Sequence, residues 1–203
     1  MSQTNNPADM QKKDTGKKML LMLAAIFVLP FTIAATLHFL DIRPSGKSFG
    51  NLIQPPVSLD IPELAEVNGN AFSPVRWEKI WSVIMIDDAN CAEACQSNID
   101  KIKRVHVSLH KEIKRVQRVL ILKGDVNQDA IAKLQVAFPD LIVLTGDAPS
   151  QLTYIANFTN AAPMGSVYLV DPLNNLMMHY PQAVSSKELR ADLRRLLKNS
   201  WAG

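Results

Sequence analysis

The sequence contains two cysteines, Cys91 and Cys95, which stand four positions apart in a chain of 203 residues. A thiolate is both a nucleophile and a ligand for soft metal ions, so this pair could exchange disulfides or hold Cu(I). In an exported compartment a close pair also oxidises readily, which makes a reversible disulfide available. A purely structural disulfide is the third interpretation, although closing so short a loop restricts the unfolded chain very little.

Acidic residues surround the pair, with Asp87 and Asp88 before it and Glu93 inside it. Negative neighbours disfavour a thiolate and favour a bound cation. The pattern therefore argues against a strongly oxidising disulfide and favours either a reducing dithiol or a soft-metal site. Two sulfurs leave a Cu(I) site incomplete, so a metal site requires a third ligand. Zinc is disfavoured, because the sequence has neither a second CxxC motif nor a clustered pair of histidines.

The elements that position the cysteines are a buried strand and the helix that follows it. Residues 81–87 form a continuous apolar run, which predicts a strand covered on both faces. Apolar residues at intervals of three and four then predict a helix from Cys91 to about Val116, capped by Asn90 or Asp88. The cysteines would share one helix face, where the positive end of the helix lowers a thiol pKa. His106 and His110 are predicted to lie on the solvated face of this helix.

Later apolar patterns predict an alternation of strands and helices. Strands are predicted at 118–123, 141–146, 167–172 and 176–180, and helices at 128–138, after the cap at 147–150, and at 187–199 behind a capping box of Ser185 and Glu188. The resulting order is βαβαβαββα. This order predicts an α/β, thioredoxin-like fold with a mixed central sheet flanked by helices.

The N-terminal segment predicts a membrane anchor. Residues 19–40 contain no Asp, Glu, Lys or Arg, and a helix of this length crosses roughly 30 Å of hydrocarbon. Four lysines within residues 1–18 predict that this tail stays cytoplasmic and that the rest of the chain is exported. The expected location is a bacterial inner membrane, crossed once, with a periplasmic domain. A cleaved signal peptide is the alternative.

Composition divides the exported part into a tether and a domain. Residues 41–62 contain four prolines and two glycines, which predict an extended tether, and residues 63–203 form the predicted thioredoxin-like domain. The formal net charge is +3, and several basic residues stand in the first 18 positions. The charge therefore gives no indication of a nucleic-acid partner.

Three segments resemble the Sco (SenC/PrrC) family of membrane-tethered, thioredoxin-like copper chaperones and thiol reductases. These are the CAEAC motif at residues 91–95, the LTG segment and its following helix at 144–159, and VYLVDPLNN at 167–175. The resemblance covers roughly residues 77–197 and includes the single N-terminal anchor. It implies a role in cytochrome c oxidase assembly, with a copper-binding oxidase subunit as the exported client.

The sequence departs from the family at the third copper ligand. The resemblance implies a histidine shortly before the YLxDP strand, where this chain has Pro163 and Met164. Pro163 could be the cis-proline that packs against the redox pair in thioredoxin-like folds. Met164 or His179 could replace the missing imidazole as a third Cu(I) donor.

Two chemical functions follow from these residues. In the first, which the missing histidine favours, the protein is a thiol–disulfide reductant that needs no cofactor. Cys91 attacks the client disulfide and Cys95 resolves the mixed disulfide. In the second, it is a chaperone that carries Cu(I) on the cysteines with Met164 or His179. A non-catalytic assembly factor that acts as a docking surface is the third possibility.

Overall fold

The computed structural model describes residues 7–40, 48–60, 64–66, 71–124, 126–146 and 149–200, and the chain divides into two units, Met1–Lys47 and Ser48–Gly203. The first unit contains α1 (Pro7–Phe39), in which Gly16–Leu37 is long and apolar enough to cross a membrane. Among the described residues it is the one helix with this property. It starts at Pro7, so the helix extends into the segment predicted as a tail.

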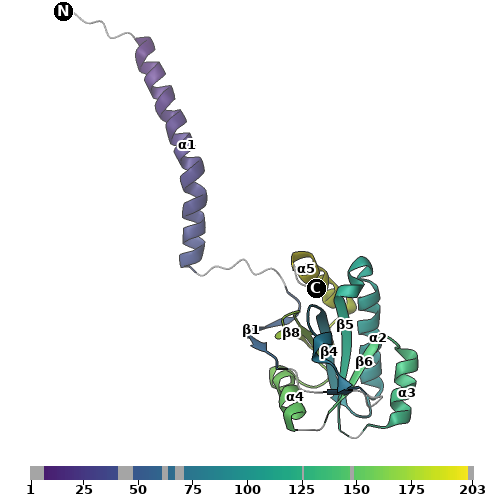
Figure 1. The fold of residues 1–203 in the computed structure, drawn as a ribbon. Coiled ribbons are helices and arrows are strands. Elements are labelled where there is room, and N and C mark those ends of the chain that lie inside the picture. Colours follow the sequence, from purple (N-terminus) through teal and green to yellow (C-terminus); the bar gives the residue numbers. More distant parts are fainter. Residues whose placement is uncertain are drawn as a thin grey trace, which may run out of the picture. The chain divides into compact units, whose positions relative to one another are not determined.

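The second unit is built on a mixed sheet with helices beside it (Figure 1). Its described strands follow the order β1-β8-β7-β4-β5-β6-β2-β3. The strands are β1 (Asn51–Ser58), β2 (Leu64–Glu66), β3 (Ala71–Phe72), β4 (Trp81–Asp88), β5 (Val116–Lys123), β6 (Leu141–Thr145), β7 (Val167–Val170) and β8 (Asn175–Tyr180). The helices are α2 (Glu93–Val107), α3 (Gln128–Ala137), α4 (Pro149–Ala161) and α5 (Ser186–Asn199), with short 3-10 helices η1 (Pro74–Arg76) and η2 (His110–Arg115). From β4 onwards, the α/β order predicted from the sequence is confirmed.

Helices cover both faces of the sheet. Val83 and Met85 of β4 belong to a buried cluster with residues of α2, α3 and α5, whereas Ile84 and Ile86 belong to a second cluster with residues of α4. This alternation follows from the two-residue period of a strand. β4 pairs in parallel with β5 and antiparallel with β7, so it is also enclosed on both edges. The continuous apolar run in β4 is the consequence of that enclosure.

The helix that follows β4 is shorter than the sequence predicts. α2 ends at Val107, and His110 has a positive φ of 53° at the start of η2. A residue in the left-handed region cannot continue a right-handed α-helix. The apolar spacing that suggested one long helix persists because steps of three residues also suit a 3-10 helix. At the C-terminal helix, the predicted capping box of Ser185 and Glu188 is present.

The prediction of an extended tether at residues 41–62 is wrong for the central part of this segment. Asn51–Ser58 form strand β1, which pairs antiparallel with β8 at the edge of the sheet. Pro55 and Pro56 lie within β1, where the register shifts between Leu52 and Val57. Proline lacks the N–H that a central strand needs, but an edge strand with an irregular register tolerates it. Residues 41–47 and 61–63 lie outside the described residues.

A buried carboxylate joins the beginning of the domain to α5. The Oδ2 atom of Asp192 accepts hydrogen bonds from Ser48 Oγ at 3.1 Å, Phe49 N at 2.7 Å and Gly50 N at 3.1 Å. Asp192 is only 3% exposed, and a Cβ added at Gly50 would meet Met178 Sδ at 2.6 Å. The backbone at Gly50 therefore packs directly on β8, and Asp192 fixes the point where the chain enters the domain.

We expect Asp192→Ala to lower the free energy of unfolding by about 2 kcal/mol, because the buried N–H of Gly50 loses its acceptor. Urea unfolding of the second unit measures this loss. Arg194→Ala is the matched control on the exposed side of α5, and we expect a change of no more than about 0.5 kcal/mol. Equal losses in the two variants would show that the carboxylate does not hold the entry segment.

Candidate functional site

Cys91 and Cys95 form a disulfide, with an S–S distance of 2.00 Å, in the connection between β4 and α2. Cys91 precedes the helix and has a φ of 35°, and its N–H donates to the carbonyl of Asp88 at 3.0 Å. Cys95 lies in the first turn of α2. The predicted caps Asn90 and Asp88 are wrong, because Ala92 occupies the N-cap position and provides no side-chain cap. The N–H groups of the first turn, to which Cys95 belongs, thus donate no hydrogen bond to a capping side chain.

The disulfide is mostly covered by its surroundings. Cys91 is 5% exposed and Cys95 is 2% exposed, and both belong to the cluster that contains Met85 and Val167. The chemistry expected of the pair needs accessible sulfurs, whereas both residues are buried and Cys91 is the slightly more exposed of the two. An incoming thiolate would reach Cys91 more readily than Cys95. The side chain of Gln96 donates to the Cys91 carbonyl at 3.2 Å and steadies this turn.

Asp87 stands on the face of the sheet that carries the disulfide. It shares that face with Val83 and Met85, whereas Asp88 belongs to the opposite face and is exposed. Burial raises the pKa of Asp87, and the charge of Asp88 raises it further, while a hydrogen bond from the Asp88 N–H opposes the shift. A half-buried carboxyl with a raised pKa can exchange a proton near the thiols.

The loop before β7 lies at the same end of the sheet as the disulfide. The N–H of Gly165 donates to the Ile86 carbonyl at 3.0 Å, and the buried Asn98 of α2 donates to the Gly165 carbonyl at 3.3 Å. These two bonds hold Pro163 and Met164 beside β4 and α2. Met164 is 36% exposed, so its thioether lies at the surface. The peptide bond before Pro163 is trans, so the prediction of a cis-proline at this position is wrong.

His179 does not join this site. It pairs in register with Tyr168, and Tyr168 belongs to the cluster on the α4 face, whereas both neighbours of His179 in β8, Met178 and Tyr180, belong to the disulfide face. Partners directly opposite in a sheet point to the same face, so His179 points away from the cysteines. Burial lowers the pKa of His179. His179 therefore lies on the other face of the sheet, although a shift of one residue in register would place it on the disulfide face.

His106 is also placed differently from the prediction. Its Nε2 atom lies 3.0 Å from the Ile113 carbonyl and 2.7 Å from the Val116 carbonyl, and its side chain is 11% exposed. Carbonyls only accept, so Nε2 carries the proton. The histidine fastens η2 to α2 instead of facing solvent. His110 is exposed, as the sequence predicts.

The structure brings together two sulfurs and, at the neighbouring loop, Pro163 and Met164 where the Sco resemblance implies an imidazole. Over the described ranges, no group of three or more His, Cys, Asp and Glu side chains is close enough to hold a metal ion. The two sulfurs are bonded to each other, and a pair of sulfurs at the start of a helix is the arrangement that thiol–disulfide exchange uses.

A surface groove of about 450 Å³ lies between α2 and α3, with Gln96, Lys133 and Phe138 among its lining. Gln96 of this lining also donates to the Cys91 carbonyl, so it connects the groove to the disulfide turn.

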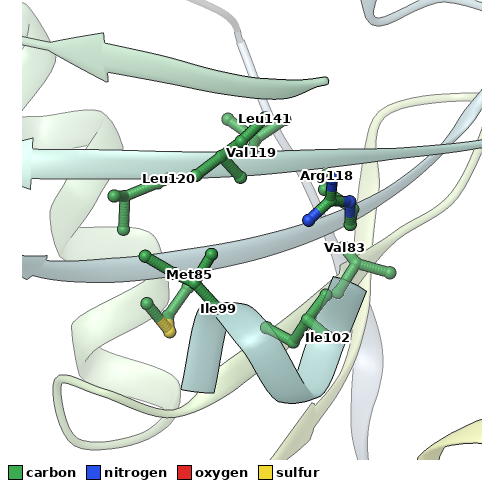
Figure 2. A pocket seen from close by; sticks show the side chains of 8 residues that line it. All are labelled: Val83, Met85, Ile99, Ile102, Arg118, Val119, Leu120 and Leu141. Atoms are coloured by element: carbon green, nitrogen blue, oxygen red, sulfur yellow. The ribbon is translucent and has the colours of Figure 1, made fainter. Parts of the chain in front are cut away.

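Arg118 is a buried charged residue that the sequence does not single out. Figure 2 shows its guanidinium in a cavity between β4, β5 and α2, lined otherwise by apolar side chains. The cavity volume of about 10 Å³ suits at most one water molecule. Arg118 is 1% exposed and forms an ion pair with Asp140, whose Oδ2 lies 3.9 Å from His106 Nδ1. In the sequence, Arg118 interrupts the apolar residues of the predicted strand at 118–123, and this interruption could have marked it as a buried charge.

Solved structures with this fold include copper proteins and a thiol oxidoreductase. ScoI from Bradyrhizobium japonicum with copper bound is 18% identical, with a TM-score of 0.53 over 68% of this chain and 99% of its own. Apo Sco1 from Thermus thermophilus is 15% identical, with a TM-score of 0.60 over 76% and 99%. A thiol:disulfide interchange protein of the thioredoxin family from Chlorobium tepidum is 13% identical, with a TM-score of 0.56 over 71% and 99%.

These likenesses confirm the thioredoxin-like fold and the resemblance to Sco proteins at the level of fold. No curated protein matches the sequence at a significant level. A family model described as "transmembrane-like, thioredoxin-like, C-terminal domain" matches residues 81–200, which span β4 to the end of α5. Because this match covers more than half of the chain, the protein belongs to the family of transmembrane-like proteins with a thioredoxin-like C-terminal domain.

Proposed function

We propose that the protein is a membrane-anchored thiol–disulfide reductant that acts through Cys91 and Cys95. The observation that carries this proposal is the disulfide at the junction of β4 and α2, with one sulfur ahead of the helix and the other in its first turn. A disulfide there serves chemistry better than stability, because only three residues lie between the two cysteines. The fold shared with a thiol:disulfide interchange protein supports the same chemistry.

The reaction transfers two electrons to the client. The Cys91 thiolate attacks a client disulfide, forms a mixed disulfide and releases one client thiolate. The Cys95 thiolate then attacks the Cys91 sulfur, which forms the Cys91–Cys95 disulfide and releases the second client thiolate. The client is reduced, and this chain is oxidised. An exported dithiol donor must return two electrons before the next cycle.

The surroundings assign different tasks to the two sulfurs. The N–H groups of the first turn of α2 stabilise a Cys95 thiolate, and the near-complete burial of Cys95 keeps it from reacting with other disulfides. Asp87, half-buried on the same face, accepts the proton that the Cys95 thiol loses. Burial and the charge of Asp88 both raise the pKa of Asp87, which makes its carboxylate a better proton acceptor.

The proposed client is a copper-binding subunit of a cytochrome c oxidase, whose cysteines must be reduced before they accept metal. Structures that share this fold are described as copper-bound Sco proteins and as cytochrome c oxidase assembly proteins. The proposed location is a bacterial inner membrane, with α1 as a single span, residues 1–18 in the cytoplasm and the domain in the periplasm. Four lysines at residues 12–18, at the N-terminal end of the apolar segment, support this orientation. The 22-residue length of Gly16–Leu37 supports a single span.

Trapping of a mixed disulfide tests the assignment of the two sulfurs. We expect reduced full-length Cys95→Ser in detergent to accumulate an adduct on Cys91 with a synthetic peptide that contains one disulfide, because the resolving thiol is absent. Cys91→Ser should accumulate at least about tenfold less adduct, since Cys95 is buried. Mass spectrometry of tryptic fragments identifies the bonded cysteine. Adducts on Cys95 would reverse the two roles, and no adduct in either variant would overturn the reductant function.

Competition for Cu(I) tests the donor set. We expect the reduced protein to bind Cu(I) more weakly than Met164→His, by about tenfold or more, because only the variant supplies an imidazole at this loop. A chromophoric Cu(I) chelator reports the affinity and the stoichiometry. Met164→Ala is the control, and it should match the unaltered protein. Tight one-to-one binding that disappears in Met164→Ala would replace the reductant by a copper carrier.

The pH dependence of stability tests the environment of Asp87. Since its pKa is raised above 3.8 in the folded state, the unfolded chain ionises first as the pH rises, and folding loses stability through that range. We expect Asp87→Asn to raise stability at about pH 7 by up to about 1 kcal/mol, limited by solvent screening, and to have no effect at about pH 3. Urea unfolding at both pH values measures the difference. A destabilised Asp87→Asn at neutral pH would contradict the burial of a charged carboxylate.

A further inference from the structure

Charge is unevenly distributed over the second unit. Residues 48–203 contain sixteen Lys and Arg and sixteen Asp and Glu, so their formal charge is zero. Acidic side chains gather at the disulfide end of the sheet, where β4 ends and α2 and α3 begin. They are Asp87, Asp88, Glu93 and Asp129. Lys123 and Lys133 also lie at this end, so the four acidic side chains outnumber these two basic ones.

The basic side chains gather on α5 and η2. Lys111 and Lys114 of η2 and Arg194, Arg195 and Lys198 of α5 are all exposed, and we call these five residues the α5–η2 basic surface. Arg115 joins the two elements, because its guanidinium donates to the Leu197 carbonyl at 2.9 Å and to the Ser200 carbonyl at 3.0 Å. The surface is therefore one rigid patch, at the far end of α2 and β5 from the disulfide.

The chain enters the domain next to this patch. Asp192, which holds Ser48 and Phe49, is one helical turn from Arg195 and two residues from Arg194. Phe49 and Leu52 at the entry are 48% and 54% exposed. Leu40 and Ser48 are eight residues apart, so the chain between them spans at most about 28 Å. A membrane that holds α1 therefore lies within reach of the entry point, whatever path residues 41–47 follow.

We propose that the α5–η2 basic surface binds the anionic phospholipid headgroups of the membrane that contains α1. The five exposed cations outnumber Glu112 of η2, which lies 3.9 Å from Lys111, so the patch complements an anionic bilayer. The exposed Phe49 and Leu52 suit its interfacial layer. The anchor makes the contact intramolecular, so electrostatic attraction that would be weak between free partners is sufficient. The inference rests on the proposed membrane anchor and is independent of the thiol chemistry.

The contact would orient the domain. With the basic surface against the bilayer, the acidic disulfide end faces away from the anionic leaflet, which repels it. Cys91 and the groove between α2 and α3 are then presented to an exported client domain instead of to lipid. The same charge separation gives attraction at one end and repulsion at the other.

Lysine footprinting of the full-length protein in nanodiscs tests the proposal. We compare discs of phosphatidylcholine with discs that contain about one third phosphatidylglycerol, at about 0.05 M and about 0.5 M salt. We expect acetylation of Lys111 and Lys198 to be about threefold slower in the anionic discs at low salt only. Lys123 and Lys133, at the disulfide end, should react equally in all four conditions. Co-elution of the protein with the disc shows separately whether α1 still anchors the protein in the bilayer.

Two double variants with reversed charges, one on the basic surface and one at the disulfide end, provide the matched comparison. We expect Lys114→Glu with Arg194→Glu to remove the protection of Lys111 and Lys198, whereas Lys123→Glu with Lys133→Glu should preserve it. Equal labelling of Lys111 and Lys198 in both disc types, with the protein still in the disc, would overturn the proposal and leave the anchor intact. Protection that persists at high salt, or that extends to Lys123 and Lys133, would also overturn it.

Discussion

The enclosure of β4 is the constraint on which the rest of the domain depends. This strand is paired on both edges and covered by helices on both faces, and Trp81–Ile86 are all buried. Its carboxyl end is therefore a fixed point from which the chain must turn at once into α2. The turn contains Cys91, which adopts a positive φ, and the first turn of α2 contains Cys95. The rigidity of one strand thus determines where both sulfurs lie.

Two hydrogen bonds extend this fixed point to a distant part of the sequence. Gly165 bonds to Ile86 through its N–H and to Asn98 through its carbonyl, so the loop before β7 lies against both β4 and α2. That loop is where a third metal ligand would stand in a Sco-like copper site, and here it contains Pro163 and Met164. The thioredoxin-like geometry is present, while the sulfurs at this end of the sheet are those of a cysteine pair and an exposed methionine. This difference is the reason that we propose electron transfer instead of metal transfer.

The helices also explain why the two ends of the domain differ in charge. Acidic residues occupy the first turns of α2, α3 and α5, and basic residues occupy the last turns of α2 and α5, as the helix dipole favours. Because α2 and α3 both begin at the carboxyl ends of parallel strands, the negative charges of their first turns lie together at the disulfide end. The same charged side chains therefore stabilise the helix ends and give the domain an uneven distribution of charge. This uneven charge is the basis of the orientation that we propose for the domain at the membrane.

Apolar periodicity was sufficient to predict the order of elements from β4 to α5 and the candidate span, because both depend on near neighbours. Local motifs predicted the capping box of α5 and singled out the pair Cys91 and Cys95. Tertiary structure alone decided the pairing of β1 in the presumed tether, the trans bond before Pro163, the burial of Arg118 and the side on which His179 lies. Strand register and ion pairing join residues far apart in the chain, and a shift of one residue reverses the face of a side chain. For that reason the spacing of the cysteines singled out a candidate site, but only the folded sheet could show which other side chains share their face.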